Sequence, residues 1–165
     1  MQRGRMAVRA RSSEEKYMKR KSRLVERRTF KRLKTPISLS IRLLGTTKYP
    51  QPINTETRNV SLEGLSIELP VILKNGRLLI QEGEEPIKLI PFLVLNEKAV
   101  ELDIKIPPMG ERIRAIGRVI WYDFGLRGAS YYLCTGIFLG KMEPEGRKKW
   151  EKFIRNIKRF LSDLN

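Results

Sequence analysis

The segment 114–139 of this chain, RAIGRVIWYDFGLRGASYYLCTGIFL, decides what kind of fold to expect. Its two ends, 114–122 and 131–139, are rich in β-branched and aromatic residues and are apolar on both faces of an extended strand. The segment 123–130 between them contains glycine, which is typical of a hairpin loop. The pattern therefore predicts a long antiparallel hairpin at the centre of a sheet.

Strands with one buried face are predicted outside this hairpin. Segments 37–43, 65–69 and 100–106 alternate apolar and polar residues, and two prolines end the last of them. Several short strands separated by turns indicate an all-β antiparallel sandwich or barrel. Residues 70–98 are interrupted by proline, glycine and adjacent glutamates, so we expect an irregular insertion there, such as an extra hairpin.

The chain ends in a different pattern. Apolar residues recur at helical spacing between basic ones, which predicts an amphipathic helix. The apolar positions are Trp150, Phe153, Ile154, Ile157, Leu161 and Leu164. Pro144, near the start, suits a first helical turn, where the missing N–H costs nothing. We expect the apolar stripe to pack on the open end of the barrel.

Charge and composition narrow the possible functions. The chain has 165 residues, with 34 Lys and Arg against 18 Asp and Glu, so its formal charge is +16 at neutral pH. This balance indicates an anionic partner. The absence of histidine excludes Ser-His-Asp and Cys-His nucleophiles and the HExxH metal site. Since Cys134 is the single cysteine and no carboxylate pair has a defined spacing, we expect no enzyme, no metal and a reducing compartment, the cytoplasm.

Most of the charge lies near the N-terminus. Residues 1–34 carry 14 Lys and Arg and 3 Glu, a net charge of 14 − 3 = +11. We expect residues 1–24 to form a basic flexible arm with a short helix, because a capping-box sequence begins at Ser12 but only a thin apolar stripe follows it. The folded domain is then 25–165. No uncharged run approaches the ~20 apolar residues of a membrane-spanning helix, so no span is expected.

Two short motifs flank the first predicted strand. An RRxxxR motif at 27–32 precedes it, and an NxSxxG motif at 59–64 follows it. Neither motif is specific by itself. RxxxR occurs five times in this basic chain, and NxSxxG is also the pattern of an Asx or Ser turn that ends in glycine.

Through their order and spacing, together with a later core pattern, these motifs make the chain resemble the PilZ domain family. The family's arginine motif is matched by Arg28 and Arg32, and its [D/N]xSxxG motif by Asn59, Ser61 and Gly64. Its core signature is matched by Gly117, Val119, Trp121, Gly136, Ile137 and Phe138. The resemblance covers residues 24–160 and implies a six-stranded antiparallel β-barrel with a C-terminal α-helix.

The resemblance also implies a bacterial signalling receptor that binds cyclic diguanylate (c-di-GMP). By similarity, the ligand-binding residues are Arg27, Arg28, Arg32, Asn59, Ser61 and Gly64. The arginines would contact phosphate and guanine, the asparagine and serine would bond to a guanine edge, and the glycine would let the backbone turn beneath the base. Arginine suits this ligand because its planar fork binds phosphate oxygens and guanine O6 and N7, and stacks on purines. No catalytic or metal-binding residue is implied, and one ligand or a stacked pair are both open.

We hypothesise that ligand binding fixes the arginine segment on the barrel and changes a surface that an unidentified protein partner recognises. Motility, adhesion and exopolysaccharide machinery are all outputs that the resemblance allows. Two alternatives stay open. In one, a basic β-barrel binds nucleic acid, with the arm tracking phosphates; in the other, a PilZ fold acts as an adaptor that binds no nucleotide.

Overall fold

The computed structural model describes residues 32–45, 52–80, 87–88 and 99–164. The described strands are β1 (Leu33–Lys34), β2 (Ser38–Leu43), β3 (Ile53–Val60), β4 (Gly64–Lys74), β5 (Arg77–Ile80), β6 (Ile87–Lys88), β7 (Ala99–Ile106), β8 (Glu111–Arg127) and β9 (Ser130–Met142), and the helix is α3 (Pro144–Asp163). The expected basic arm, 1–24, and two of the predicted ligand-binding arginines, Arg27 and Arg28, lie outside the described residues.

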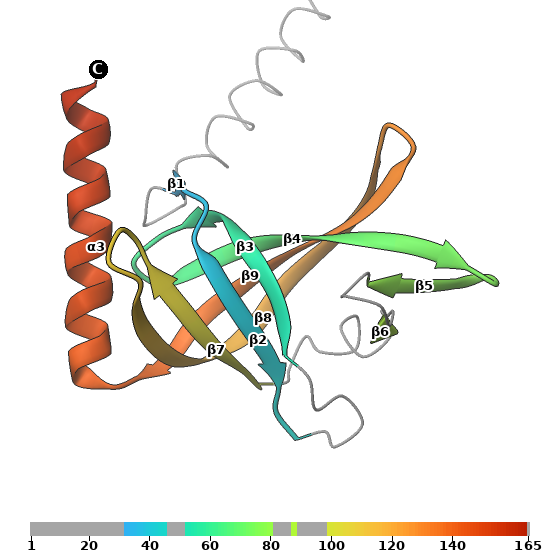
Figure 1. Ribbon diagram of the computed structural model, residues 1–165, viewed down its shortest axis with the longest axis horizontal. Helices are drawn as coiled ribbons and strands as arrows, with labels where there is room; N and C mark the ends of the chain where they lie inside the picture. Colours follow the sequence, from blue (N-terminus) through green and yellow to red (C-terminus); the bar gives the residue numbers. More distant parts are fainter. Residues whose placement is uncertain (1–31, 46–51, 81–86, 89–98, 165) are drawn as a thin grey trace, which may run out of the picture. The chain divides into compact units, whose positions relative to one another are not determined.

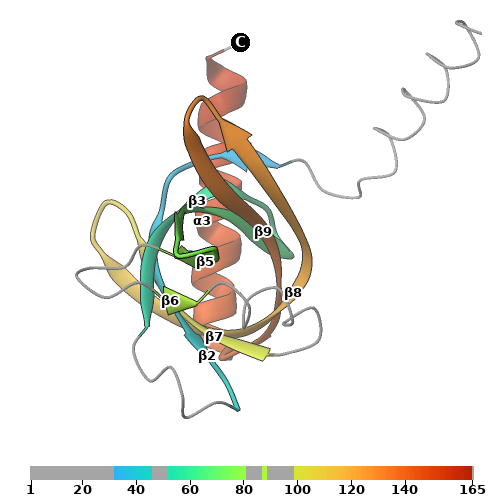
Figure 2. The same ribbon diagram turned by 90° about the vertical axis from the view of Figure 1, so that its right-hand side faces the viewer.

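The strands form a closed barrel. Within the described part of the chain, neighbouring strands follow the order β3-β2-β7-β8-β9-β4, and an additional pairing of β3 with β4 closes the ring. Every pairing is antiparallel. The six-stranded antiparallel β-barrel with a C-terminal helix is therefore confirmed. Figure 1 shows the barrel from the side, and Figure 2 looks along it towards α3.

The interior of the barrel is aliphatic, because the alternating strands turn their apolar residues inward. In β7, Leu102 and Ile104 have no exposed surface, whereas Glu101 and Lys105 lie on the outer face. The same holds for Leu39 in β2. A period of two along each of these strands places successive side chains on opposite faces, so the alternating pattern predicts which of their residues enter the core.

The central hairpin is longer than predicted. The segment 123–130 was expected to be a loop, but β8 continues to Arg127 and β9 begins at Ser130. Residues from Asp123 onward pair with β9, so ladder hydrogen bonds outweigh the weak strand preference of Gly125. The turn is reduced to two residues, of which Gly128 has a positive φ of 61°.

One barrel strand was not singled out from the sequence. β3 reads INTETRNV, in which polar residues occupy most positions and only Ile53, Thr57 and Val60 point into the core. A register shift between Thr57 and Asn59 breaks the period of two at the point where β4 pairs with it. The buried Thr57 side chain links β3 to Ile37, the residue before β2. Its Oγ1 accepts a hydrogen bond from the Ile37 N–H at 3.0 Å.

Part of the region 70–98 is regular. β4 continues through Pro70. At this residue β4 pairs with β9 on one side only, because the pairing of β4 with β3 has ended and its pairing with β5 has not begun. Proline is tolerated at such an edge position. The chain then turns at Asn75 and Gly76, with φ of 51° and 70°, as a two-residue hairpin turn requires. Segments 81–86 and 89–98 lie outside the described residues.

The helix α3 covers one end of the barrel (Figures 1 and 2). It begins at Pro144, as its sequence predicted, and buries Trp150 and Ile154 completely. Phe153, Ile157 and Leu161 are partly buried against the same core. Among the described residues, no helix is both long and apolar enough to cross a membrane.

Candidate ligand-binding face on the barrel

Four residues of adjacent strands form a row on the outer face of the barrel. Asn59 of β3 lies opposite Ser66 of β4, Ser66 lies opposite Gly136 of β9, and Gly136 lies opposite Trp121 of β8. Each belongs to the side of its strand that faces away from the aliphatic core. Two polar side chains, a glycine and an indole are thus aligned across the sheet.

Trp121 lies directly on Gly136. A Cβ placed on Gly136 would overlap the indole, with Nε1 and Cε2 as the nearest atoms. Glycine is therefore required here, because any side chain would push the indole off the sheet. The bare backbone of Gly136 leaves room for the ring on the sheet. This explains why the sequence has tryptophan and glycine at these two matched positions.

Arg32 extends over the same indole. Its guanidinium carbon is 5.7 Å from the centroid of the Trp121 ring, which is cation–π distance. The short strand β1 places Arg32 there, because Leu33 pairs with Val60 of β3 and Lys34 pairs with Asn59. Arg32 is exposed and has no ion-pair partner among the described residues. Of the three predicted arginines, the structure thus brings Arg32 to the face that contains Asn59.

Asn59 is half-buried and orients its amide towards β4. Its Nδ2 donates a hydrogen bond to Ser66 Oγ at 3.2 Å. The amide oxygen has no partner in the described part of the chain and is available as an acceptor. Ser66, only 4% exposed, was missed by the sequence analysis. Its signal was its outward position in the alternating segment 65–69, two residues after Gly64.

Ser61 and Gly64 form a closed turn. The Ser61 N–H donates to Gly64 O at 2.8 Å, the Gly64 N–H donates to Ser61 Oγ at 3.2 Å, and Ser61 Oγ donates to Gly64 O at 3.1 Å. A Cβ on Gly64 would lie 2.6 Å from the carbonyl oxygen of Ile137 in β9. Gly64 is thus needed for close approach to β9, and its expected role in a turn beneath a base stays a prediction.

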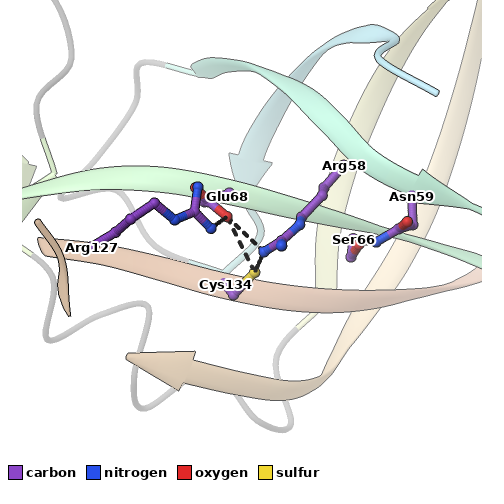
Figure 3. Close-up of polar contacts among 6 residues, drawn as sticks. All are labelled: Arg58, Asn59, Ser66, Glu68, Arg127 and Cys134. Atoms are coloured by element: carbon purple, nitrogen blue, oxygen red, sulfur yellow. Dashed lines mark hydrogen bonds and ion pairs between the residues drawn. The ribbon is translucent and has the colours of Figure 1, made fainter. Parts of the chain in front are cut away.

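A charged cluster continues along β4 beyond Ser66 (Figure 3). Glu68 accepts from Arg58 Nη1 at 2.7 Å and from Arg127 at 3.0 and 3.2 Å. Cys134 Sγ lies 3.5 Å from Arg58 Nη1. The hydrogen bond with Cys134, followed by the negative charge of Glu68, raises the pKa of Arg58. Two arginines share one carboxylate, which leaves the cluster cationic.

Metal binding has no support in the described part of the chain. No group of three or more His, Cys, Asp or Glu side chains there could hold an ion. The face presents guanidinium groups, an amide, hydroxyls and an indole, which are groups that bind anions and planar rings.

Several solved structures have a fold similar to that of this chain. No protein-family model and no curated protein matches the sequence. The PilZ domain of YcgR from Escherichia coli, solved with c-di-GMP, matches with a TM-score of 0.53 at 12% identity, over 83% of this chain and 95% of that chain. MrkH of K. pneumonia matches with a TM-score of 0.54 at 12% identity, over 82% of this chain and 51% of that chain.

A third solved structure, Borreliella burgdorferi PlzA in complex with c-di-GMP, matches with a TM-score of 0.51 at 9% identity, over 82% of this chain and 53% of that chain. The chain therefore has a PilZ-like fold, as its motifs predicted. It spans about half the length of MrkH and PlzA. At these sequence identities, the similarity concerns the fold alone.

Proposed function

We propose that this chain is a c-di-GMP receptor, and a binding protein without catalytic activity. The ligand would occupy the outer face formed by Asn59, Ser66 and Trp121, with Arg32 above it. The observation that carries the proposal is the placement of the Arg32 guanidinium, which has no ion pair among the described residues, over the Trp121 indole. On the same face, the Asn59 amide oxygen also lacks a partner within that part of the chain. Two PilZ-like neighbours, YcgR and PlzA, were solved with c-di-GMP, which supports the ligand's identity.

The chemistry of the face matches the parts of this ligand. A cyclic dinucleotide carries two phosphates and two guanines. Arg32 supplies a permanent cation that forks onto phosphate oxygens or guanine O6 and N7. The Asn59 amide oxygen can accept from the guanine N1–H and N2–H donors, and a purine can stack on the exposed side of an indole or guanidinium. We assign Arg27 and Arg28, which complete the RRxxxR motif, to the second phosphate and guanine.

Calorimetry with c-di-GMP tests the proposal, using the purified full chain. We expect micromolar or tighter binding, with Arg32→Ala weakening it about tenfold or more, since one charge-assisted hydrogen bond contributes roughly 1.5–3 kcal/mol. The matched control is Arg155→Ala on α3, which removes the same charge from a guanidinium whose one hydrogen bond within the described residues is to Glu151 O of its own helix. That variant should bind within about twofold of the unchanged chain.

Two results would contradict the proposal. One is the absence of binding at tens of micromolar c-di-GMP. The other is an equal loss in Arg32→Ala and Arg155→Ala with a steep salt dependence, which would indicate a general polyanion site and favour the nucleic-acid alternative. A chain lacking residues 1–24 then separates the arm's electrostatics from the barrel's contribution.

The signalling output follows from the same hypothesis. Binding would fix the arginine segment against the barrel and change a surface that a protein partner recognises. The candidate partners are components of motility, adhesion or exopolysaccharide machinery, the outputs that the family resemblance allows. A pull-down that requires c-di-GMP and fails with Arg32→Ala would support the relay. Ligand-independent capture would favour the adaptor alternative.

A further inference from the structure

The backbone of the NxSxxG turn is fixed by hydrogen bonds to its carbonyl oxygens from α3 and β9. The carbonyl oxygens of three consecutive residues, Ser61, Leu62 and Glu63, all accept hydrogen bonds from elsewhere in the chain. Glu63 O accepts from the Leu139 N–H of β9 at 2.8 Å. The other two accept from one atom, the indole Nε1 of Trp150 on α3, at 3.1 Å from Ser61 O and 3.3 Å from Leu62 O.

Trp150 is unusual among the core residues of α3. It has no exposed surface, and its ring lies 5.9 Å from the ring of Phe153 on the same helix. A phenylalanine or leucine would fill the barrel end, but only an indole carries a donor N–H that reaches the two carbonyls. Buried carbonyls without a donor are costly, so the indole both packs the core and fixes the turn.

The direction of these bonds bears on the ligand face. Across a planar trans peptide, a carbonyl and the following N–H point in opposite directions. Because Trp150 holds the carbonyls of Ser61 and Leu62, the N–H groups of Leu62 and Glu63 point away from α3. Neither N–H has a partner among the described residues. The indole therefore sets which side of the turn carries these donors.

We propose that Trp150 is a positioning residue for the NxSxxG turn, whose Ser61 and Gly64 are ligand-binding residues by resemblance: it couples the C-terminal helix to this segment, 89 residues earlier. The inference rests on the proposed function for its ligand, but the coupling itself is a property of the chain. Removal of the indole N–H would loosen the turn, spread the orientations of its free N–H groups, and weaken c-di-GMP binding while the barrel stays folded.

The test compares Trp150→Phe with Phe153→Leu, which alters packing against the Trp150 ring but keeps the indole N–H that bonds to the turn. Amide hydrogen exchange is measured first, without ligand. In Trp150→Phe we expect the Gly64 and Leu139 amides, which bond within and onto the turn, to exchange about tenfold faster, as the loss of one hydrogen bond implies. The Leu102 amide, in the barrel wall, should be unchanged in both variants.

Calorimetry follows on the same proteins. We expect Trp150→Phe to bind c-di-GMP about three- to tenfold more weakly and Phe153→Leu to bind as the unchanged chain does. Unchanged exchange at Gly64 and Leu139 in Trp150→Phe would overturn the inference, and so would faster exchange with unchanged affinity. If the unchanged chain binds no c-di-GMP, the proposed function fails, and the exchange measurement alone decides whether Trp150 positions the turn.

Discussion

The two ends of the β8–β9 hairpin have similar sequences and different environments. Within the barrel, Ile113 and Val119 of β8 are 1% and 2% exposed. Further along the same side of the strand, Phe124 and Leu126 are 38% and 59% exposed. All four are apolar and lie on the face of β8 that continues the inner face of the barrel. A register shift between Val119 and Trp121 moves the inward positions of β8 from odd to even residue numbers. The inward face thus continues along the strand, but its burial does not.

The difference arises from what lies across the hairpin. At the barrel end, closure of the ring and α3 place aliphatic side chains opposite Ile113 and Val119. The other end projects beyond the ring (Figure 1). There Phe124 stacks on Tyr131 with centroids 5.6 Å apart and an interplanar angle of 11°. Apolar residues in a strand therefore show where a buried face is possible, and the neighbours decide whether it forms.

The largest expected effect is a contrast between two alanine substitutions in this one strand. Ile113→Ala should lower the free energy of unfolding by about 2–5 kcal/mol, because it leaves a cavity in a closed core. Leu126→Ala should change it by less than about 0.5 kcal/mol, since its side chain is mostly in solvent. Urea unfolding of both variants measures the difference. Equal losses would mean that the projecting end is buried in solution.

A second contrast uses two glycines of the same hairpin. A Cβ on Gly136 would meet the indole of Trp121, whereas a Cβ on Gly125 would meet the ring end of Tyr132. Gly136→Ala should cost about 1–3 kcal/mol, because Trp121 lies under Arg32 and on the sheet and cannot move without losing both contacts. Gly125→Ala should cost less than about 1 kcal/mol, since the new methyl group would meet only the hydroxyl end of Tyr132, and a small rotation of this side chain relieves that contact.

The readout for the glycine pair is thermal unfolding together with tryptophan fluorescence. Gly136→Ala should shift the emission of Trp121 as the indole moves towards solvent, and c-di-GMP binding should weaken with it. Gly125→Ala is the control for a new methyl group in the same ladder. If Gly136→Ala bound c-di-GMP normally with a displaced indole, Trp121 would have no part in the proposed face.

The contrast also shows what the sequence could predict. Clean alternation in β2 and β7 placed their buried residues correctly, because one face of each strand meets a closed core. β3 was missed because Thr57 fills a core position and the following bulge breaks the period. The end of the central hairpin was missed because its residues after Tyr122 have no strong local preference for a strand. Pairing with β9 keeps them extended.

The candidate site divides in the same way. Arg32, Asn59 and Ser61 could be selected from the sequence, since each belongs to a short motif, RRxxxR or NxSxxG. Ser66 could not, because its role depends on the register that sets it opposite Asn59. Trp150 was expected only as a core residue. Its bond to Ser61 O depends on how α3 docks, and no local pattern contains that information.

The smallest expected effect concerns the ion pairs that join the projecting end to β3. Arg127 crosses the ring of Tyr132, at 4.9 Å from its centroid, to reach Glu68, which also binds Arg58. The two arginines are 60% and 47% exposed, so solvent screens both pairs. Glu68→Gln should therefore cost only about 0.2–1 kcal/mol, and the cost should fall further in 0.5 M salt, where the Debye length is only a few ångströms, about 4 Å.

The control is Glu101→Gln, which removes a single ion pair with Arg42 at 3.7 Å on the barrel wall. It should have no measurable effect, because that wall is already fixed by its core. A larger, salt-sensitive effect at Glu68 than at Glu101 would show that charge on the outer face partly replaces the core that the projecting end lacks. Equal effects would mean that backbone pairing with β9 and the Phe124–Tyr131 stack hold this end by themselves.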